Sequence, residues 1–212
     1  MENLGNLRRE YKSHELDEKN IAADPFDQFF TWLSEAIDSK ETDATAMVLS
    51  TVNEQNRPSS RIVLLKHFDN NGFDFFTNYN GKKSKHLEKN PYASLLFYWD
   101  TLERQVRIEG KIEKISAEES DTYFASRPEQ SKIAAWASPQ STVIPNRKTL
   151  KDWYEEMEDI MSTKEIKRPP HWGGFRLVPD LFEFWQGRES RLHDRIEYVL
   201  NSQDWKIRRL AP

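Results

Sequence analysis

The chain of 212 residues is long enough for one compact domain with a sizeable core, and its composition excludes several classes of protein. Aromatic residues make up 12% of it, too many for a disordered chain, and the lack of cysteine excludes disulfides and thiolate zinc sites. A net charge of -4 argues against a general nucleic-acid binder. No apolar run reaches the roughly 18 residues of a transmembrane helix, and residues 1–19 lack the apolar core of a signal peptide. We therefore expect a cytoplasmic protein without nucleic-acid or membrane partners.

The first 23 residues are polar and show no strong periodicity, so we expect a flexible N-terminal segment. Asp24 and Pro25 then match an N-cap followed by proline at the first helical position. Apolar residues at helical spacing follow, which predicts an amphipathic helix packed on a core: Phe26, Phe29, Phe30, Leu33, Ala36 and Ile37.

From residue 46 onward the apolar residues favour strands, interrupted by helical segments. The predicted strands are 46–52, 61–68, 73–77, 93–99, 104–115, 175–178, 181–186, 195–200 and 205–210. A hairpin turn is expected over 69–72, and helices over 82–89, from a capping box at 116–119 up to Pro128, and over 149–161. The last helix is predicted to bury one side, with Leu150, Trp153, Tyr154, Met157, Ile160 and Met161. Residues 24–212 therefore predict a single mainly β domain, a β-barrel of antiparallel strands with inserted helices.

Three lysines stand at the expected start of the helix over 82–89, where the helix dipole favours acidic residues. Lys82, Lys83 and Lys85 follow Gly81 directly after a strand. Such cations either lie in solvent or accompany a phosphate that the backbone N–H groups of a helix start hold. The local sequence leaves both interpretations open.

Two further groups of polar residues could recognise a phosphate. Arg61 and Lys66 flank an apolar strand, but a straight strand directs them to opposite faces, and exposure at the strand ends is the simpler interpretation. Both could reach one ligand through a bend, a bulge or a subunit boundary. Tyr123 and Arg127 are spaced to share a helix face, and Ser131 follows; such pairs are also common on helix surfaces.

The stretch 182–195 joins an aromatic strand, a glycine and a row of charges. If residues 191–195 are extended, Arg191, His193 and Arg195 share one face. Cations on one face repel each other unless a negative or electron-rich group lies there. A solvated edge strand is the simplest interpretation, whereas the neighbouring Trp185 and Gly187 favour the wall of a ligand site.

Other chemistry has no sequence signal. The five histidines show no metal-ligand spacing, so we expect no metal site. The sequence contains no P-loop, no dinucleotide-binding glycine motif and no G-x-S-x-G, which argues against nucleotide hydrolases, Rossmann dehydrogenases and α/β-hydrolases.

Several stretches together resemble the pyridoxine (pyridoxamine) 5′-phosphate oxidase family, which are FMN enzymes of the split-barrel class. They are Leu-Arg-Arg-Glu-Tyr at 7–11, Arg-Ile-Val-Leu-Leu-Lys at 61–66, Thr-Leu-Glu-Arg-Gln-Val at 101–106, Trp-Gly-Gly-Phe-Arg at 172–176, Trp-Gln-Gly at 185–187 and Arg-Leu-His-Asp-Arg at 191–195. The likeness spans nearly the whole chain. Two positions depart from the family pattern: Phe76 stands where tyrosine is frequent, and Lys82, where arginine is frequent, cannot bind a phosphate in bidentate geometry.

The resemblance implies two sets of binding residues. Those for FMN are Arg61, Ile62, Val63, Leu64, Leu65, Lys66, Phe76, Thr77, Lys82, Lys83, Gln105, Gln140, Ser141, Trp185 and Arg195. Those for the phosphorylated substrate are Arg8, Arg9, Glu10, Tyr11, Lys66, Tyr123, Arg127, Ser131, Arg191, Leu192 and His193, with Arg191 and His193 as the catalytic pair over the substrate ring.

The activity implied by the resemblance is the oxidation of pyridoxine or pyridoxamine 5′-phosphate to pyridoxal 5′-phosphate. A hydride passes from C4′ to flavin N5, a cation such as Arg195 stabilises the reduced flavin, and dioxygen reoxidises it to give hydrogen peroxide. The family also implies a homodimer with FMN in clefts at its interface. A non-catalytic split-barrel protein that binds flavin or pyridoxal phosphate, and a flavin reductase on the same barrel, are the alternatives.

Overall fold

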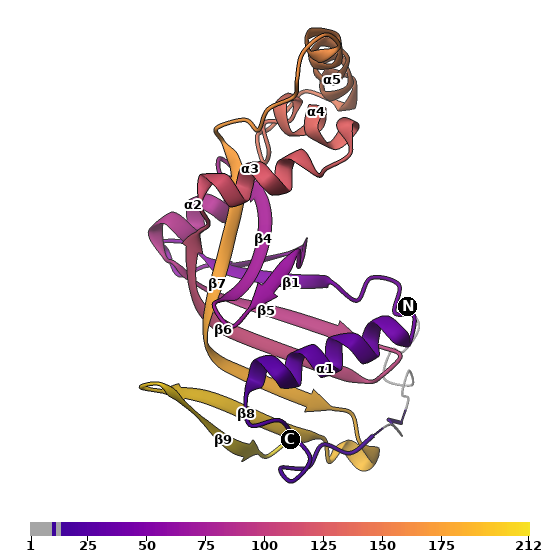
Figure 1. The fold of residues 1–212 in the computed structure, drawn as a ribbon, viewed down its shortest axis with the longest axis vertical. Coiled ribbons are helices and arrows are strands. Elements are labelled where there is room, and N and C mark those ends of the chain that lie inside the picture. The colour runs from indigo at the N-terminus through magenta and orange to yellow at the C-terminus, as the bar shows by residue number, and fades with distance from the viewer. Residues whose placement is uncertain (1–9, 12–13) are drawn as a thin grey trace, which may run out of the picture. The chain divides into compact units, whose positions relative to one another are not determined.

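The computed structural model describes residues 10–11 and 14–212 (Figure 1). Its helices are α1 (Pro25–Asp38), α2 (Lys82–Lys89), α3 (Ala117–Ala125), α4 (Glu129–Ala137) and α5 (Arg147–Met161), with a 3-10 turn η2 at Glu189–Arg191. Its strands are β1 (Ala46–Val52), β2 (Pro58–Leu64), β3 (His67–Asp69), β4 (Gly72–Asn78), β5 (Tyr92–Trp99), β6 (Arg104–Lys114), β7 (Trp172–Gln186), β8 (Asp194–Asn201) and β9 (Asp204–Leu210). Arg8 and Arg9 lie outside the described residues.

Within the described residues, nine strands form one sheet, in the order β2-β1-β5-β6-β7-β4-β3, with β8 paired to both β7 and β9. The pairings β3–β4, β4–β7, β7–β8 and β8–β9 are antiparallel. The predicted fold class, mainly β with antiparallel strands and inserted helices, is confirmed. Among the described residues, no helix is both long and apolar enough to cross a membrane.

Contacts divide the chain into two compact units. Among the described residues, the first comprises 10–11, 14–49, Ser94–Gly110 and Pro179–Pro212, and the second comprises Ser50–Ala93 and Lys111–Val178. Four strands, β1, β5, β6 and β7, contribute residues to both.

Helix α1 supplies one side of the first unit's core (Figure 1). It begins as predicted: the Asp24 side chain accepts a hydrogen bond from the N–H of Phe26 at 2.7 Å. Phe29 meets Phe97 of β5 edge to face at 5.1 Å between ring centroids, and other α1 aromatics meet β7 in the same way. The predicted apolar face was too wide, because Phe30 is 61% exposed.

The segment just before α1 packs within the first unit. Leu16 is buried, and its N–H donates to Asp194 Oδ2 at 3.2 Å. The Tyr198 hydroxyl donates to the carbonyl of Ala22 at 2.7 Å. These contacts attach residues 16–22 to β8.

The strand predicted over 61–68 is two strands, because the backbone leaves the ladder at Leu65 and Lys66. The N–H of Lys66 donates to the carbonyl of Asp74 at 2.9 Å, which turns the chain toward β4. The hairpin turn predicted next is confirmed, with Asp69 paired to Gly72.

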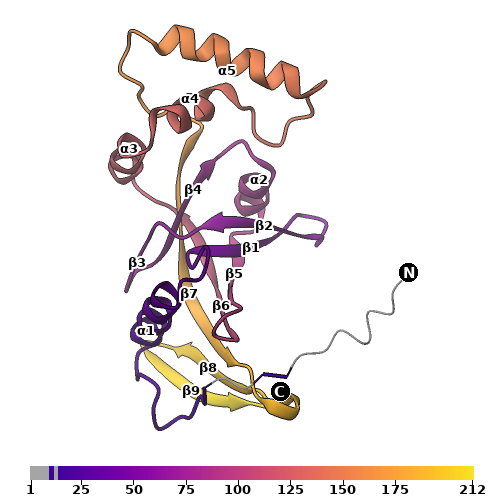
Figure 2. The same cartoon turned by 90° about the vertical axis from the view of Figure 1, so that its right-hand side faces the viewer.

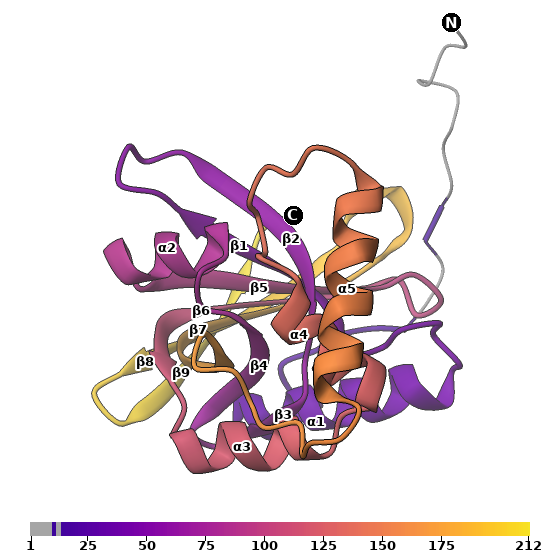
Figure 3. The same ribbon diagram turned by 90° about the horizontal axis from the view of Figure 1, so that it is seen from above.

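The helices of the second unit differ from prediction in three ways. The capping box of Ser116 and Glu119 is confirmed, but α3 ends at Ala125, before the expected stop at Pro128. Pro128 is the N-cap of α4, a helix the sequence did not predict, because a proline that stops one helix can also begin the next. Helices α4 and α5 lie side by side (Figures 2 and 3). The predicted side of α5 is its less exposed side, but it is only half-buried in this chain, and Ile160 on it is 48% exposed.

The strands predicted over 175–178 and 181–186 are one continuous strand, β7, which leads into the β8–β9 hairpin (Figure 2). Pro179 does not break it, because it lies between the stretch paired with β4, up to Leu177, and the stretch paired with β8, from Leu181. At this position a proline gives up no hydrogen bond to β4 or β8.

Candidate active site

Cationic and polar side chains of the second unit gather at the start of α2. Lys83 Nζ donates to Thr77 Oγ1 at 2.9 Å and to Gln140 Oε1 at 2.6 Å. The N–H of Lys82 donates to Ser141 Oγ at 3.2 Å. These contacts join the end of β4, the first turn of α2 and the loop after α4, so five of the predicted cofactor residues lie together.

Gly81 permits this close approach. A Cβ atom at position 81 would lie 2.4 Å from Gln140 Oε1, so a larger residue would displace the amide. Gly81 is also the N-cap of α2, where no side chain caps the helix and no acidic residue stands in the first turn. The positive end of the helix is therefore not neutralised by its own first turn, as in a helix start that accepts an anion.

Arg61 adds a further cation to this group. Its Nη1 donates to Thr51 Oγ1 at 2.8 Å, and burial lowers its pKa. Burial and then the charge of Arg61 lower the pKa of Lys83 to about 8. A phosphate beside these groups would favour the ammonium form and return the pKa of Lys83 toward its usual range. The residues present therefore fit the phosphate of a flavin nucleotide.

The rest of the predicted segment, residues 62–66, is only partly buried. Residues of β2 alternate between exposed and half-buried, with Ile62 61% exposed, whereas Leu65 is buried. Lys66 is exposed beyond the end of β2. The break between β2 and β3 is the kind of bend that Arg61 and Lys66 need in order to serve one ligand.

A second cluster of the second unit contains three of the predicted substrate residues, Tyr123, Arg127 and Ser131, and also Phe76, which was predicted to bind the cofactor. The rings of Phe76 and Tyr123 stack with 3.9 Å between their centroids, and the Arg127 guanidinium carbon lies 4.5 Å from the ring centroid of Trp172. Among the described residues, Arg127 Nη1 is a buried side-chain nitrogen without a hydrogen-bond partner. Burial lowers the pKa of Arg127 and raises that of Tyr123. A buried guanidinium N–H without a partner fits a site whose anionic ligand completes it.

Arg127 reaches this cluster by a route the sequence did not predict. It lies two residues beyond the end of α3, in the turn where its own N–H donates to the carbonyl of Phe124 at 3.2 Å. It therefore does not share a helix face with Tyr123. Arg127 and Ser131 instead line one cavity of about 170 Å³, together with Trp172 and Gln140.

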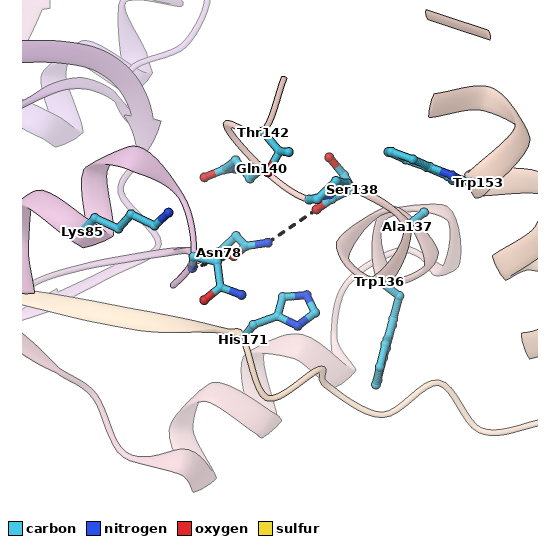
Figure 4. A pocket seen from close by; sticks show the side chains of 11 residues that line it. Asn78, Lys85, Trp136, Ala137, Ser138, Gln140, Thr142, Trp153 and His171 are labelled. Carbon is cyan, nitrogen blue, oxygen red and sulfur yellow. Dashed lines mark hydrogen bonds between the residues drawn. The ribbon is translucent and has the colours of Figure 1, made fainter. Parts of the chain in front are cut away.

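A larger cavity of about 560 Å³ shares Asn78, Ser138 and Gln140 with the smaller one (Figure 4). Asn78 Nδ2 donates to the carbonyl of Ser138 at 3.5 Å, and His171 lies beside this pair. Trp136 on α4 and Trp153 on α5 also line the larger cavity. Helices α4 and α5 thus help to shape the surroundings of the substrate cluster.

The first unit holds an aromatic group around His193. Its ring centroid lies 4.7 Å from that of Trp185. Tyr11 meets both rings edge to face, with centroid distances of 5.5 Å to His193 and 5.6 Å to Trp185. The N–H of Arg188 donates to His193 Nδ1 at 3.1 Å, so the neutral ring carries its proton on Nε2. Burial and then the charge of Arg191 lower the pKa of His193, which favours the neutral ring.

The extended backbone predicted for 191–195 is wrong. Residues 189–191 form a 3-10 turn, and Ser190 and Arg191 have φ values of 56° and 62°. Strand alternation therefore starts only at Asp194, and Arg191, His193 and Arg195 do not form one row. A charged run without alternating apolar residues carries no burial signal that would keep it extended. Glu10, Arg191 and Leu192 are exposed.

Arg195 is paired with a carboxylate and is not a bare cation. Across the β7–β8 ladder it lies opposite Trp185, and its guanidinium contacts the buried Glu183, which also pairs with Arg107. Gln105 is half-buried on β6.

Sequence reasoning missed Glu183, Arg107, Trp172, Thr51 and His86 as parts of these clusters; His86 belongs to the first through its Nδ1, which lies 3.1 Å from Thr51 Oγ1. For Glu183 a signal existed: it alternates with Phe182 and Phe184 on β7, so it shares a face with Trp185. For Trp172 the only signal was its place in the stretch 172–176. Thr51 and His86 gave none, because their roles depend on pairing between distant segments.

Two family models match the chain. One, described as pyridoxamine 5′-phosphate oxidase, covers residues 33–161, and one described as the pyridoxine 5′-phosphate oxidase C-terminal dimerisation region covers residues 172–212. A pyridoxine/pyridoxamine 5′-phosphate oxidase of Paraburkholderia phytofirmans is 53% identical over 214 residues, with 100% of both chains covered. A protein of the same name from Burkholderia multivorans is 54% identical over 218 residues, again with 100% of both chains covered.

Solved structures show the same fold. PhzG from Burkholderia lata 383, in complex with tetrahydrophenazine-1-carboxylic acid, superposes with a TM-score of 0.88 at 28% identity and covers 94% of this chain and 99% of its own. A pyridoxamine 5′-phosphate oxidase-related, FMN-binding protein from Nostoc punctiforme shares the fold with a TM-score of 0.72 at 18% identity, over 91% of this chain and 100% of its own. With both family models and full-length relatives above 50% identity, this chain belongs to the pyridoxine/pyridoxamine 5′-phosphate oxidase family and has its split-barrel fold.

Proposed function

We propose that this protein is an FMN-dependent oxidase that converts pyridoxine 5′-phosphate or pyridoxamine 5′-phosphate to pyridoxal 5′-phosphate. The observation that carries this proposal is the presence of two cationic clusters, both of which border Gln140. One comprises Arg61, Lys83 and the start of α2, and the other centres on the buried Arg127. A reaction between a phosphorylated cofactor and a phosphorylated substrate needs two such clusters, one for each phosphate.

The first cluster would hold the FMN phosphate. Lys83 and Arg61 supply charge, while Ser141 and the backbone at the start of α2 supply hydrogen bonds. Trp185, Gln105 and Arg195 are proposed to contact the same cofactor on the resemblance alone. When bound, FMN accepts a hydride from the substrate and passes the electrons to dioxygen, which yields hydrogen peroxide.

The second cluster would hold the substrate phosphate. Arg127 Nη1 offers an N–H that nothing else in the described chain accepts, and Tyr123 and Ser131 offer hydroxyl groups. Trp172 holds the guanidinium on its ring face, and Phe76 holds the phenol ring by stacking. Substrate orientation would then be set before any chemistry, which lowers the entropic barrier of the reaction. Lys66 is proposed as a further contact from the resemblance.

Arg191 and His193 are proposed to hold the ring of the substrate. The neutral His193 is fixed by the Arg188 N–H at Nδ1, so its Nε2–H can donate to a ring substituent. Tyr11 packs on His193 and Trp185 and would cover the bound substrate, with Glu10 beside it. We also propose a homodimer, supported by the match of 172–212 to a dimerisation region.

Absorption and oxygen uptake test the function together. We expect purified protein to show flavin absorbance, and to consume oxygen with pyridoxine 5′-phosphate or pyridoxamine 5′-phosphate but far less with unphosphorylated pyridoxine. A colourless protein that takes up no added FMN would contradict the proposal. A yellow protein without turnover would instead favour a non-catalytic binding protein, and reduction by a nicotinamide cofactor alone would favour a flavin reductase.

A second candidate substrate class comes from PhzG, whose structure contains a tetrahydrophenazine carboxylic acid. The anionic group of that ligand is a carboxylate, whereas that of the vitamers is a phosphate. The buried Arg127 can pair with either anion, but the relatives above 50% identity bear the vitamer name. Oxygen uptake with a dihydro- or tetrahydrophenazine acid in the same assay separates the two substrates.

A further inference from the structure

The hydroxyl group of Thr51 joins Arg61 to His86 in the second unit. Arg61 Nη1 lies 2.8 Å from Thr51 Oγ1, and the same oxygen lies 3.1 Å from His86 Nδ1. Thr51 is fully buried on β1, and His86 is 8% exposed on α2. The three residues come from three elements, β2, β1 and α2, so this short chain of hydrogen bonds ties them together.

The chemistry of the groups sets the direction of these bonds. A guanidinium has only donors, so Thr51 Oγ1 accepts from Arg61. The single hydroxyl proton is then available to His86 Nδ1, with the carbonyl of Ser59 a more distant acceptor at 3.4 Å. Burial, followed by the charges of Lys82 and Arg61, lowers the pKa of His86, which keeps the ring neutral and able to accept. The bonds therefore run from Arg61 through Thr51 to His86.

His86 stands three residues after Lys83 and four after Lys82 on the same helix. The helix whose start gathers Lys83, Gln140 and Ser141 is therefore also the helix that anchors Arg61. Arg61 and Lys83 repel each other, and this repulsion contributes to the lowered pKa of Lys83. The hydrogen bond to Thr51 opposes this repulsion and restricts the orientation of the long arginine side chain before an anion arrives.

We propose that Thr51 and His86 are positioning residues that hold Arg61 for the phosphate of the cofactor, and so determine the preference of this protein for FMN over unphosphorylated riboflavin. This inference rests on the proposed function and deepens it. Neither residue touches the phosphate; each acts through Arg61. The effect should therefore appear only with a ligand that carries the phosphate.

Titration of the flavin-free protein with FMN and with riboflavin, followed by flavin fluorescence, tests the proposal. Thr51→Val keeps the shape of the side chain and removes the hydroxyl. We expect it to weaken FMN binding about ten-fold, the loss typical of a hydrogen bond to a charged group, and to change riboflavin binding by less than about two-fold. Thr51→Ser restores the hydroxyl and should recover most of the FMN affinity.

A second pair of variants tests His86 independently of β1. His86→Asn retains an oxygen acceptor near the position of Nδ1, and His86→Leu removes it. We expect His86→Leu to reduce the preference for FMN over riboflavin, and His86→Asn to retain more of it. Ser120→Ala is the matched control, because Ser120 is also buried in the second unit, where its hydroxyl accepts from the N–H of Gly174 at 3.2 Å. It should leave the preference for FMN unaltered.

Two results would overturn the inference alone: equal losses of FMN and riboflavin affinity in Thr51→Val, or FMN affinity that Thr51→Ser does not restore. A different result would overturn the proposed function as well, namely that the unaltered protein binds neither flavin. The comparison of the two ligands thus separates a failure of the positioning role from a failure of the cofactor assignment.

Discussion

Arg195 donates two hydrogen bonds to the carboxylate of Glu183, from Nε to Oε1 at 2.8 Å and from Nη2 to Oε2 at 3.1 Å. Arg107 contacts the same carboxylate from β6. Burial alone would raise the pKa of Glu183, but the hydrogen bonds from the two arginines outweigh burial and lower it. The cation proposed to act on the flavin is therefore held in place, and partly balanced, by a buried anion.

Glu183→Gln should destabilise the protein. Glu183 is 3% exposed, whereas the side chains of Arg195 and Arg107 are about one-third exposed, so water can solvate them after the carboxylate is lost. We therefore expect a loss of about 2 kcal/mol in the free energy of unfolding, below the usual range for a fully buried pair. Urea unfolding at neutral pH measures it. Glu113→Gln removes the exposed partner of Lys111 and should change stability by less than about 0.5 kcal/mol.

The pH dependence of this pair has a definite sign. The folded-state pKa of Glu183 is lowered from 4.5, so its stabilising effect is present above pH 4.5 and is lost as the pH falls through the folded-state pKa. The difference in stability between the unaltered protein and Glu183→Gln should thus shrink below pH 4.5. A difference that stays constant on acidification would show that the charge of Glu183 is not what stabilises the pair.

Local sequence was sufficient for the elements whose signals are local. The capping box at Ser116, the hairpin turn ending at Gly72 and helix α2 were predicted at or within one residue of their observed places, because capping, turn chemistry and alternation act between near neighbours. The expectation failed where a local signal has two meanings. Pro128 was expected to end one helix but begins another, and the charged run 191–195 has no alternating apolar residues that would specify a strand.

The cofactor and substrate residues were named by resemblance, and their spacing alone did not predict how they gather. Lys83, Thr77 and Gln140 meet only because α2 and the loop after α4 pack together. Arg127 and Trp172 are 45 positions apart in the sequence, by subtraction of their numbers, and their stacking depends on the path of β7. Such contacts are tertiary, so no period or motif within one segment could predict them.

Flavin binding should weaken as the pH rises past about 8, the value to which burial and Arg61 lower the pKa of Lys83. Above it the flavin-free protein must take up a proton at Lys83 before the ammonium can pair with the phosphate. The phosphate itself stays fully ionised, since its second pKa is about 6. We expect the dissociation constant of FMN to rise by up to about ten-fold per pH unit there. Titrations from pH 7 upward measure it.

Lys83→Arg provides the control for this pH dependence. A guanidinium stays charged throughout the range, so the rise in the dissociation constant above pH 8 should disappear even if binding is weaker overall. A variant that keeps the same pH dependence would show that a group other than Lys83 titrates.

Arg127→Met should separate stability from substrate binding. The change removes a buried guanidinium with an unpaired Nη1, which favours the folded state, and removes its contact with the Trp172 ring, which opposes it. We expect the ligand-free protein to keep its free energy of unfolding within about 1 kcal/mol. The KM for pyridoxine 5′-phosphate should rise by about ten-fold to a hundred-fold, with flavin binding retained. Arg147→Met, at the exposed start of α5, is the control. An unchanged KM would remove Arg127 from the substrate site.

Arg191→Leu and His193→Ala should lower turnover and substrate binding while leaving the flavin bound. His193 packs on Trp185 and is fixed by the N–H of Arg188, whereas Arg191 stands exposed in η2 at positive φ. Neither belongs to the cluster around Lys83, so the phosphate of FMN keeps its partners. We expect kcat/KM to fall at least about ten-fold in each variant, because each loses an oriented contact to the substrate. Glu189→Gln, in the same turn, controls for disturbance of η2. Flavin absorbance of the purified variants decides the division of roles: release of FMN from either one would place that residue at the cofactor instead.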